Sequence, residues 1–149
     1  MNCAFWGTTT AVETENFVRL LNADLATEFQ SIVQYVEHIA IVTGAEYTNT
    51  VVELRAHLAQ ELHHATALAE QVSFLGGTPT TEVPPVARHD DSESALRADL
   101  DLETCQLERY RERVQQATDM GLADVAEALR PLLTQTQEHV RDLQTALGR

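Results

Sequence analysis

Residues 54–75 read LRAHLAQELHHATALAEQVSFL, and this stretch decides the fold. Leucines recur along it at steps of three or four residues or multiples of them, which places them on one face of an α-helix. They are Leu54, Leu58, Leu68 and Leu75. Two polar residues, Glu61 and His64, fall on the same face. The stretch therefore predicts a long helix whose buried face carries a carboxylate and an imidazole one turn apart.

Three further segments show the same periodicity. The predicted helices cover residues 11–43, 49–75, 92–119 and 122–147. Residues 76–91 contain glycines and prolines without periodicity, so we expect an irregular crossover between the second and third helices. Short links within each pair of helices make antiparallel neighbours. The sequence therefore predicts an all-α, antiparallel four-helix bundle in a single domain of residues 1–149.

Several residues predict where the helices begin. Thr10 with Glu13 and Thr50 with Glu53 have the spacing of a capping box. Ser92 is expected to cap the third helix.

Two further residues predict where helices are interrupted. Gly44 is expected to stop the first helix. Pro131 lies inside the fourth periodic segment and is expected to kink that helix or delay its start.

The composition limits the classes of function. Acidic residues outnumber basic ones by 23 to 10, which gives a formal charge of −13. This balance disfavours nucleic acid and anionic membranes as direct partners and favours cations. Aromatic residues make up only 5% of the chain, so we expect a core of Leu, Val, Ile and Ala.

The N-terminal residues and the cysteines add two expectations. Residues 1–7 lack a basic region followed by a long apolar stretch, so the sequence predicts no signal peptide and a cytoplasmic protein. Cys3 and Cys105 do not form a C-x-x-C pair, which argues against a disulfide framework and against a cysteine-based metal site.

Five polar residues interrupt the apolar faces of the predicted helices. They are Glu28, Glu61, His64, Glu103 and His139. A buried carboxylate without a partner either destabilises the folded state by roughly several kcal/mol or takes up a proton. A multivalent cation at the centre of the bundle would remove this penalty and also the repulsion between like charges. The pattern therefore predicts a buried metal site.

These landmarks occur twice, and the residue numbers of the two sets differ by a constant amount, the repeat offset. Glu28, Tyr35, Glu61 and His64 correspond to Glu103, Tyr110, Thr136 and His139. The chain is thus two helical hairpins with matching polar positions, and a site shared between the hairpins explains the match. Thr136 is the exception, because it stands where a second E-x-x-H glutamate would be.

The same residues resemble the bacterioferritin branch of the ferritin-like superfamily. The likeness lies in EFQSIVQY (28–35), ELHH (61–64), DLDLE (99–103) and His139, and FLGGTP (74–79) is similar to the family's exit from its second helix. It extends from about residue 15 to residue 147. The resemblance implies the ferritin-like topology, in which the second and third helices are joined by the long crossover.

The resemblance also implies a di-iron centre that oxidises ferrous iron with O2 or peroxide for storage or detoxification. Glu28 and Glu103 would be terminal or bridging ligands, Glu61 a bridging ligand, and His64 and His139 the nitrogen ligands. Tyr35 matches a tyrosine beside the family's iron site, where it could donate a hydrogen bond or an electron. For Tyr110 we favour ordinary core packing.

Three departures from the family's pattern carry further expectations. Thr136 removes one bridging carboxylate, so the two metal positions are expected to be unequal, with the tighter one at Glu28, Glu61 and His64. Leu62 stands where haem-binding forms carry Met, so haem is not expected. Arg149 follows soon after the fourth helix, so we expect a homodimer or another small oligomer without the fifth helix of a 24-subunit shell.

Some alternatives stay open at this point. His57 or Asp142 could replace the missing carboxylate in a shifted site, although each is more typical of a flanking residue. Manganese or zinc could take the place of iron. The chain could also be a di-metal oxygenase acting on an organic substrate, or a helical binding module with a degenerate metal site.

Overall fold

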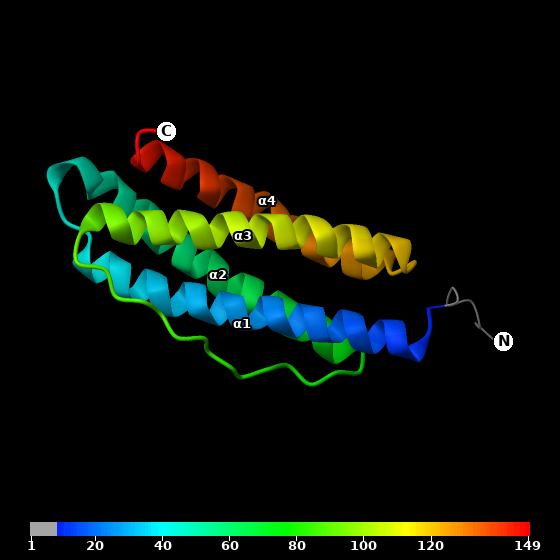
Figure 1. Ribbon diagram of the computed structural model, residues 1–149. Helices are drawn as coiled ribbons and strands as arrows, with labels where there is room; N and C mark the ends of the chain where they lie inside the picture. Colours follow the sequence, from blue (N-terminus) through cyan, green and yellow to red (C-terminus); the bar gives the residue numbers. More distant parts are fainter. Residues whose placement is uncertain (1–8) are drawn as a thin grey trace.

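The computed structural model describes residues 9–149 and contains four long helices (Figure 1). They are α1 (Ala11–Ile41), α2 (Thr48–Phe74), α3 (Ser92–Asp119) and α4 (Ala123–Ala146), with a short 3-10 helix η1 (Ala45–Tyr47) before α2. The predicted all-α four-helix bundle is therefore confirmed. Cys3 and the N-terminal residues that bear on a signal peptide lie outside the described residues.

The helices form two antiparallel hairpins that pack against each other. α1 packs mainly on α2 and α3 mainly on α4, while α1 also contacts α3 and α2 also contacts α4. The crossover of residues 75–91 returns along the whole length of the bundle, on the outside of α1 (Figure 1). The Asn22 side chain of α1 holds this segment, because it donates to the carbonyl of Thr78 and accepts from the amide of Thr80.

The first predicted capping box is confirmed and the second is wrong. Thr10 Oγ1 accepts from the amide of Glu13, and the Glu13 carboxylate accepts from the amide of Thr10. In contrast, α2 already begins at Thr48, directly after η1, so Thr50 lies inside the helix. The 3-10 turn orders the chain before Thr50 is reached.

The predicted cap of the third helix is displaced by one residue. Asp91 is the N-cap, and its carboxylate accepts from the amide of Ser94 at 2.8 Å. Ser92 instead exchanges hydrogen bonds with the backbone of Thr43 and so ties the end of the crossover to the link between α1 and α2.

The apolar core is divided into two clusters by a polar layer. One cluster contains Leu21, Leu25, Leu68 and Leu129 among its residues, and the other contains Leu54, Leu96, Leu107 and Leu143. Along α1, α2 and α4 the residues of the two clusters are separated by buried polar positions, which are Glu28, Glu61, His64, Thr136 and His139. The polar centre of the bundle thus has an apolar cluster on each side along the bundle axis.

Buried polar pairs follow the same repeat offset. Arg113 donates to Asp24 at 2.7 Å, and the equivalent pair in the other hairpin joins His38 to Asp99 at 2.8 Å. All four side chains are at most 5% exposed. The two hairpins are therefore related by an approximate twofold axis that passes through the polar layer.

No helix among residues 9–149 is long and apolar enough to span a membrane.

Of the two effects expected of Pro131, a kink or a late start, the late start is wrong, because α4 begins at Ala123 and includes the exposed Pro131. Proline cannot donate a backbone hydrogen bond, and its ring crowds the preceding turn.

We expect Pro131→Ala to raise the free energy of unfolding by about 2 kcal/mol, after allowance for the more flexible unfolded chain. Urea denaturation measures the change. Glu138→Ala, also exposed on α4, is the control and should change stability by less than about 0.5 kcal/mol; equal stability of Pro131→Ala and the unmodified protein would contradict the prediction.

Candidate metal centre

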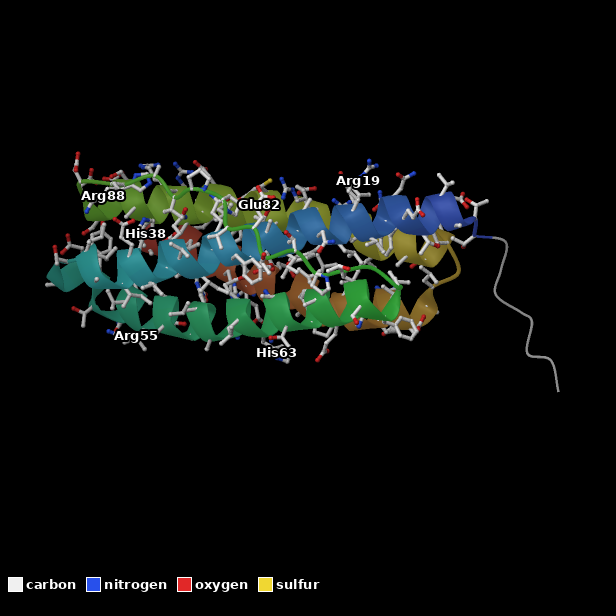
Figure 2. All side chains as sticks on the ribbon, turned by 90° about the horizontal axis from the view of Figure 1, so that it is seen from below. Arg19, His38, Arg55, His63, Glu82 and Arg88 are labelled. Carbon is white, nitrogen blue, oxygen red and sulfur yellow. The ribbon has the colours of Figure 1, made fainter. Side chains whose placement is uncertain are left out.

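The five polar residues singled out by the sequence converge in the polar layer. α1 supplies Glu28, α2 supplies Glu61 and His64, α3 supplies Glu103 and α4 supplies His139. Each of these side chains is at most 1% exposed. The neighbouring His63, by contrast, points from α2 toward solvent (Figure 2).

The convergence forms two groups that share Glu61. In one group Glu61 lies with Glu28 and His64, and in the other with Glu103 and His139. Within each group, one ligand atom from every residue lies within 4.8 Å of the others. Each group could hold one ion with two carboxylates and one imidazole.

Glu61 turns one carboxylate oxygen toward each group. Its Oε1 lies 2.7 Å from Nδ1 of His139, and its Oε2 lies 3.3 Å from Nδ1 of His64. This is the geometry of a carboxylate that bridges two neighbouring ions.

Two tyrosines cross-link the hairpins around the centre. Tyr35 of α1 donates to Oε1 of Glu103 on α3 at 2.6 Å, and Tyr110 of α3 donates to Oε1 of Glu28 on α1. Tyr110 packs in the apolar core, as expected, and its hydroxyl also contacts a candidate ligand, which the sequence analysis did not predict. Each hydroxyl holds one oxygen of its carboxylate, and the other oxygen has no hydrogen-bond partner.

Two glutamines orient the histidines, and the sequence did not identify this role. Nε2 of His64 lies 2.7 Å from Oε1 of Gln135, and Nε2 of His139 lies 2.6 Å from Oε1 of Gln60. A glutamine oxygen only accepts, so each Nε2 carries the proton and donates. The Nδ1 lone pairs are thereby turned toward the carboxylates, as metal ligation requires. The signal was present in the sequence, because Gln60 and Gln135 are also related by the repeat offset.

Thr136 occupies the position equivalent to Glu61 and points into the same layer. Its side chain is 1% exposed. Within the part of the chain that the structure describes, five polar atoms of this layer have no hydrogen-bond partner: Oε2 of Glu28, Oε1 of Glu61, Oε2 of Glu103, Oγ1 of Thr136 and Nδ1 of His139. Unsatisfied buried oxygens and nitrogens are rare and costly. A cation at the centre would satisfy them, so the donor set fits bound metal.

The electrostatics of the metal-free layer point the same way. Burial, reinforced by the neighbouring Glu61, raises the pKa of Glu28 well above its ordinary value. Burial and the charge of Glu103 likewise raise the pKa of Glu61. Burial opposes charge on His139 and Glu103 too, yet the attraction between them prevails, because Nδ1 of His139 lies 3.3 Å from Oε2 of Glu103. The pKa of His139 rises to about 10 and that of Glu103 falls below its ordinary value. Without metal, the layer lowers its charge by retaining protons.

The residues considered for a shifted site lie beside the centre. His57 is 2% exposed and its ring stacks on that of His139, with centroids 4.0 Å apart. Nε2 of His57 lies 3.2 Å from Oδ2 of Asp142, which is partly exposed. Neither residue enters the two groups that share Glu61.

Comparison with known proteins agrees with this geometry. The ferritin-like domain matches residues 18–149. Bacterioferritin BfrA of Mycobacterium tuberculosis is 24% identical over 131 residues, covering 87% of this chain and 82% of the relative. Bacterioferritin of Brucella melitensis is 26% identical over 131 residues, with 87% and 81% covered.

Two solved structures share the fold. A ferritin-like, diiron-carboxylate protein of Bacillus anthracis superposes with a TM-score of 0.87 at 27% identity, over 93% of this chain and 99% of that one. The dodecameric thioferritin of Bacteroides fragilis, a bacterioferritin-related protein, gives a TM-score of 0.83 at 25% identity, over 91% and 86%. The chain belongs to the ferritin-like family and to its bacterioferritin-like branch.

Proposed function

We propose that this protein binds ferrous iron in the polar layer and oxidises it with O2 or peroxide, for storage or detoxification. The observation that supports the proposal most is the position of Glu61, which offers one oxygen to each of two groups of buried ligands. Iron favours such mixed carboxylate and imidazole sites, and carboxylates stabilise the ferric product. The bacterioferritin relatives and the diiron-carboxylate protein of Bacillus anthracis support the choice of iron. Manganese and zinc would compete for the same donors.

Glu28 and His64 would be the terminal ligands at one position, and Glu103 and His139 those at the other. Three carboxylates face two divalent ions, so about one positive charge would stay uncompensated in a layer that excludes water. Such a charge is costly in a medium of low dielectric constant. We therefore propose unequal positions, with the tighter one at Glu28, Glu61 and His64.

The oxidation would remove one electron from each of two ferrous ions. If O2 is the oxidant, it takes up the two electrons and two protons and becomes hydrogen peroxide. If hydrogen peroxide is the oxidant, it takes up the two electrons and two protons and becomes two molecules of water. The protein's part is to hold both substrates of the reaction in a dry, preorganised layer. Tyr35 would hold Glu103 in place through its 2.6 Å hydrogen bond and could donate a proton or an electron.

The two alternatives receive less support from the structure. A di-metal oxygenase needs an apolar pocket beside the metals, but the cleft nearest to His57 is lined by Glu46, Glu53 and Asp142. A degenerate helical module would pack the histidines against apolar side chains. His64 and His139 instead face carboxylates and are oriented by glutamines.

Anaerobic titration with ferrous iron tests the proposal. We expect the unmodified protein to take up one ion tightly and a second ion at least tenfold more weakly, because Thr136 supplies no charge. Thr136→Glu should bring the two affinities together and speed iron oxidation, since it restores the fourth carboxylate at the position equivalent to Glu61. Two equal, tight sites in the unmodified protein would show that Thr136 does not limit the second position.

Two variants serve as controls for this titration. Glu61→Gln should weaken both positions, because each group contains Glu61. Thr134→Glu adds the same charge at an exposed position on α4 and should leave both affinities unchanged. A protein that binds no iron in any of these forms would refute the proposed function.

Metal binding should also release protons. His139 has a pKa of about 10 without metal, so it carries an extra proton at pH 7 that an ion must displace from Nδ1. Affinity should therefore rise with pH across the range from about 6 to 9, by up to about tenfold per pH unit for each proton displaced. Manganese titration with a pH indicator measures the protons. His139→Gln should release about one proton fewer per chain, and equal release from both forms would contradict the assignment.

We also propose that the protein forms a dimer or another small oligomer. The bacterioferritin-related neighbour of Bacteroides fragilis is a dodecamer, which supports self-association. The −13 charge opposes self-association, so any assembly should tighten as moderate salt screens the repulsion. Light scattering at low and moderate salt measures the mass. A mass of several hundred kilodaltons would exclude a small oligomer.

A further inference from the structure

A second group of potential ligands lies in an open cleft beside the buried centre. The cleft has a volume of about 390 Å³ and is formed by η1, α2 and the C-terminal part of α4. Glu46, Glu53 and Asp142 line it together with His57, and no Lys or Arg belongs to its lining among the described residues. A cleft lined by charge of one sign concentrates ions of the opposite sign.

Three of these residues have the geometry of a metal site. Glu53, His57 and Asp142 each offer one ligand atom, and these atoms lie within 4.8 Å of one another. Glu53 and Asp142 are exposed and can adjust around an ion, whereas His57 is 2% exposed and fixed by its packing against His139. The group therefore combines one rigid nitrogen with two mobile carboxylates.

The hydrogen bonds of His57 leave a place for a cation. Tyr35 has one hydroxyl proton and donates it to Glu103 at 2.6 Å, so its oxygen can only accept from Nδ1 of His57, 3.4 Å away. Nε2 of His57 lies 3.2 Å from Oδ2 of Asp142, within hydrogen-bonding distance. A neutral imidazole carries one ring proton, so it can donate to Tyr35 or to Asp142 but not to both. A metal ion between Nε2 and Asp142 would bind both of these atoms and leave the ring proton on Nδ1 for Tyr35.

The positions related by the approximate twofold axis show that the fold does not require these residues. The positions that the repeat offset relates to Glu53, His57 and Asp142 are Ala128, Leu132 and Ala67. Leu132 is 1% exposed, so an apolar side chain fills the buried position equivalent to His57. The polar group is thus not repeated at the equivalent place between the same two helices.

We propose that Glu53, His57 and Asp142 form a third divalent-cation site, which collects ferrous ions in the cleft and supplies them to the buried centre. This inference rests on the proposed function of that centre. The contact of His57 with both His139 and Tyr35 places the third site next to the ligands of the second position. With two carboxylates and open coordination to water, its affinity would be lower than that of the buried groups, as suits a site that must release its ion.

Manganese binding followed by electron paramagnetic resonance tests the site without iron chemistry. The resonance signal measures free Mn²⁺, so its decrease on addition of the metal-free protein gives the number of ions bound. We expect the double variant Glu53→Gln/Asp142→Asn to bind one ion fewer per chain in the weak class, and His57→Leu to do the same while reproducing the packing of Leu132. Glu127→Gln, which removes an exposed carboxylate far from this cleft, should bind as the unmodified protein does. Unchanged binding in the double variant and in His57→Leu would overturn the proposal.

Iron oxidation then tests the supply of ions. In the double variant, the ferrous concentration for half-maximal rate should rise at least fivefold, with the maximal rate unchanged within twofold. An unchanged half-maximal concentration would overturn the role in supply. Glu61→Gln separates the two proposals, because it should weaken the tight class of Mn²⁺ and leave the third site intact. The unmodified protein could bind Mn²⁺ only weakly, and the cleft variants could lose one of these weakly bound ions. This result would support the third site and refute the proposed centre.

Discussion

The structure depends on the burial of like charges at its centre. Three carboxylates and two imidazoles lie at most 1% exposed between two apolar clusters, in a place where most bundles would have leucine. The cost of this arrangement is visible in the raised pKa values of Glu28 and Glu61, which result from burial and from the charge of neighbouring carboxylates. Burial of the two apolar clusters stabilises the folded chain, whereas burial of the charged centre without metal destabilises it.

The surrounding polar contacts hold the ligands at fixed positions. Tyrosines act across α1 and α3, and glutamines act across α2 and α4, so every candidate ligand except Glu61 is held by a tyrosine or glutamine of the opposite hairpin. Most of these contacts obey the approximate twofold axis. Thr136 breaks it inside the centre, and the residues around His57 break it in the cleft, so both departures concern the part of the molecule that handles ions.

The sequence was sufficient to predict the four helices and the buried positions of Glu28, Glu61, His64, Glu103 and His139. Helical periodicity and the repeat offset are properties of the chain alone, so they could be read without coordinates. The caps at Thr50 and Ser92 were wrong, because neighbouring residues compete to end a helix and the outcome depends on the adjoining turn. The contacts of Tyr110, Gln60 and Gln135 depend on how the hairpins rotate against each other, which spacing along one helix does not reveal. His57 and Asp142 were each considered as ligands of a shifted site, but their meeting with Glu53 in one cleft was not predicted, since Asp142 comes from the opposite hairpin.

The repeated polar contacts have a consequence for the origin of the molecule. Each hairpin carries a carboxylate, a tyrosine, a glutamine and a histidine in the same order, and each completes the other's half of the centre. A single ancestral hairpin that paired with its own copy would contain the whole arrangement, and gene duplication with fusion would yield the present chain. Once the halves were joined, selection no longer had to act on both together. In such a fused chain each half could vary by itself, which would allow Thr136 to differ from Glu61 and His57 to differ from Leu132.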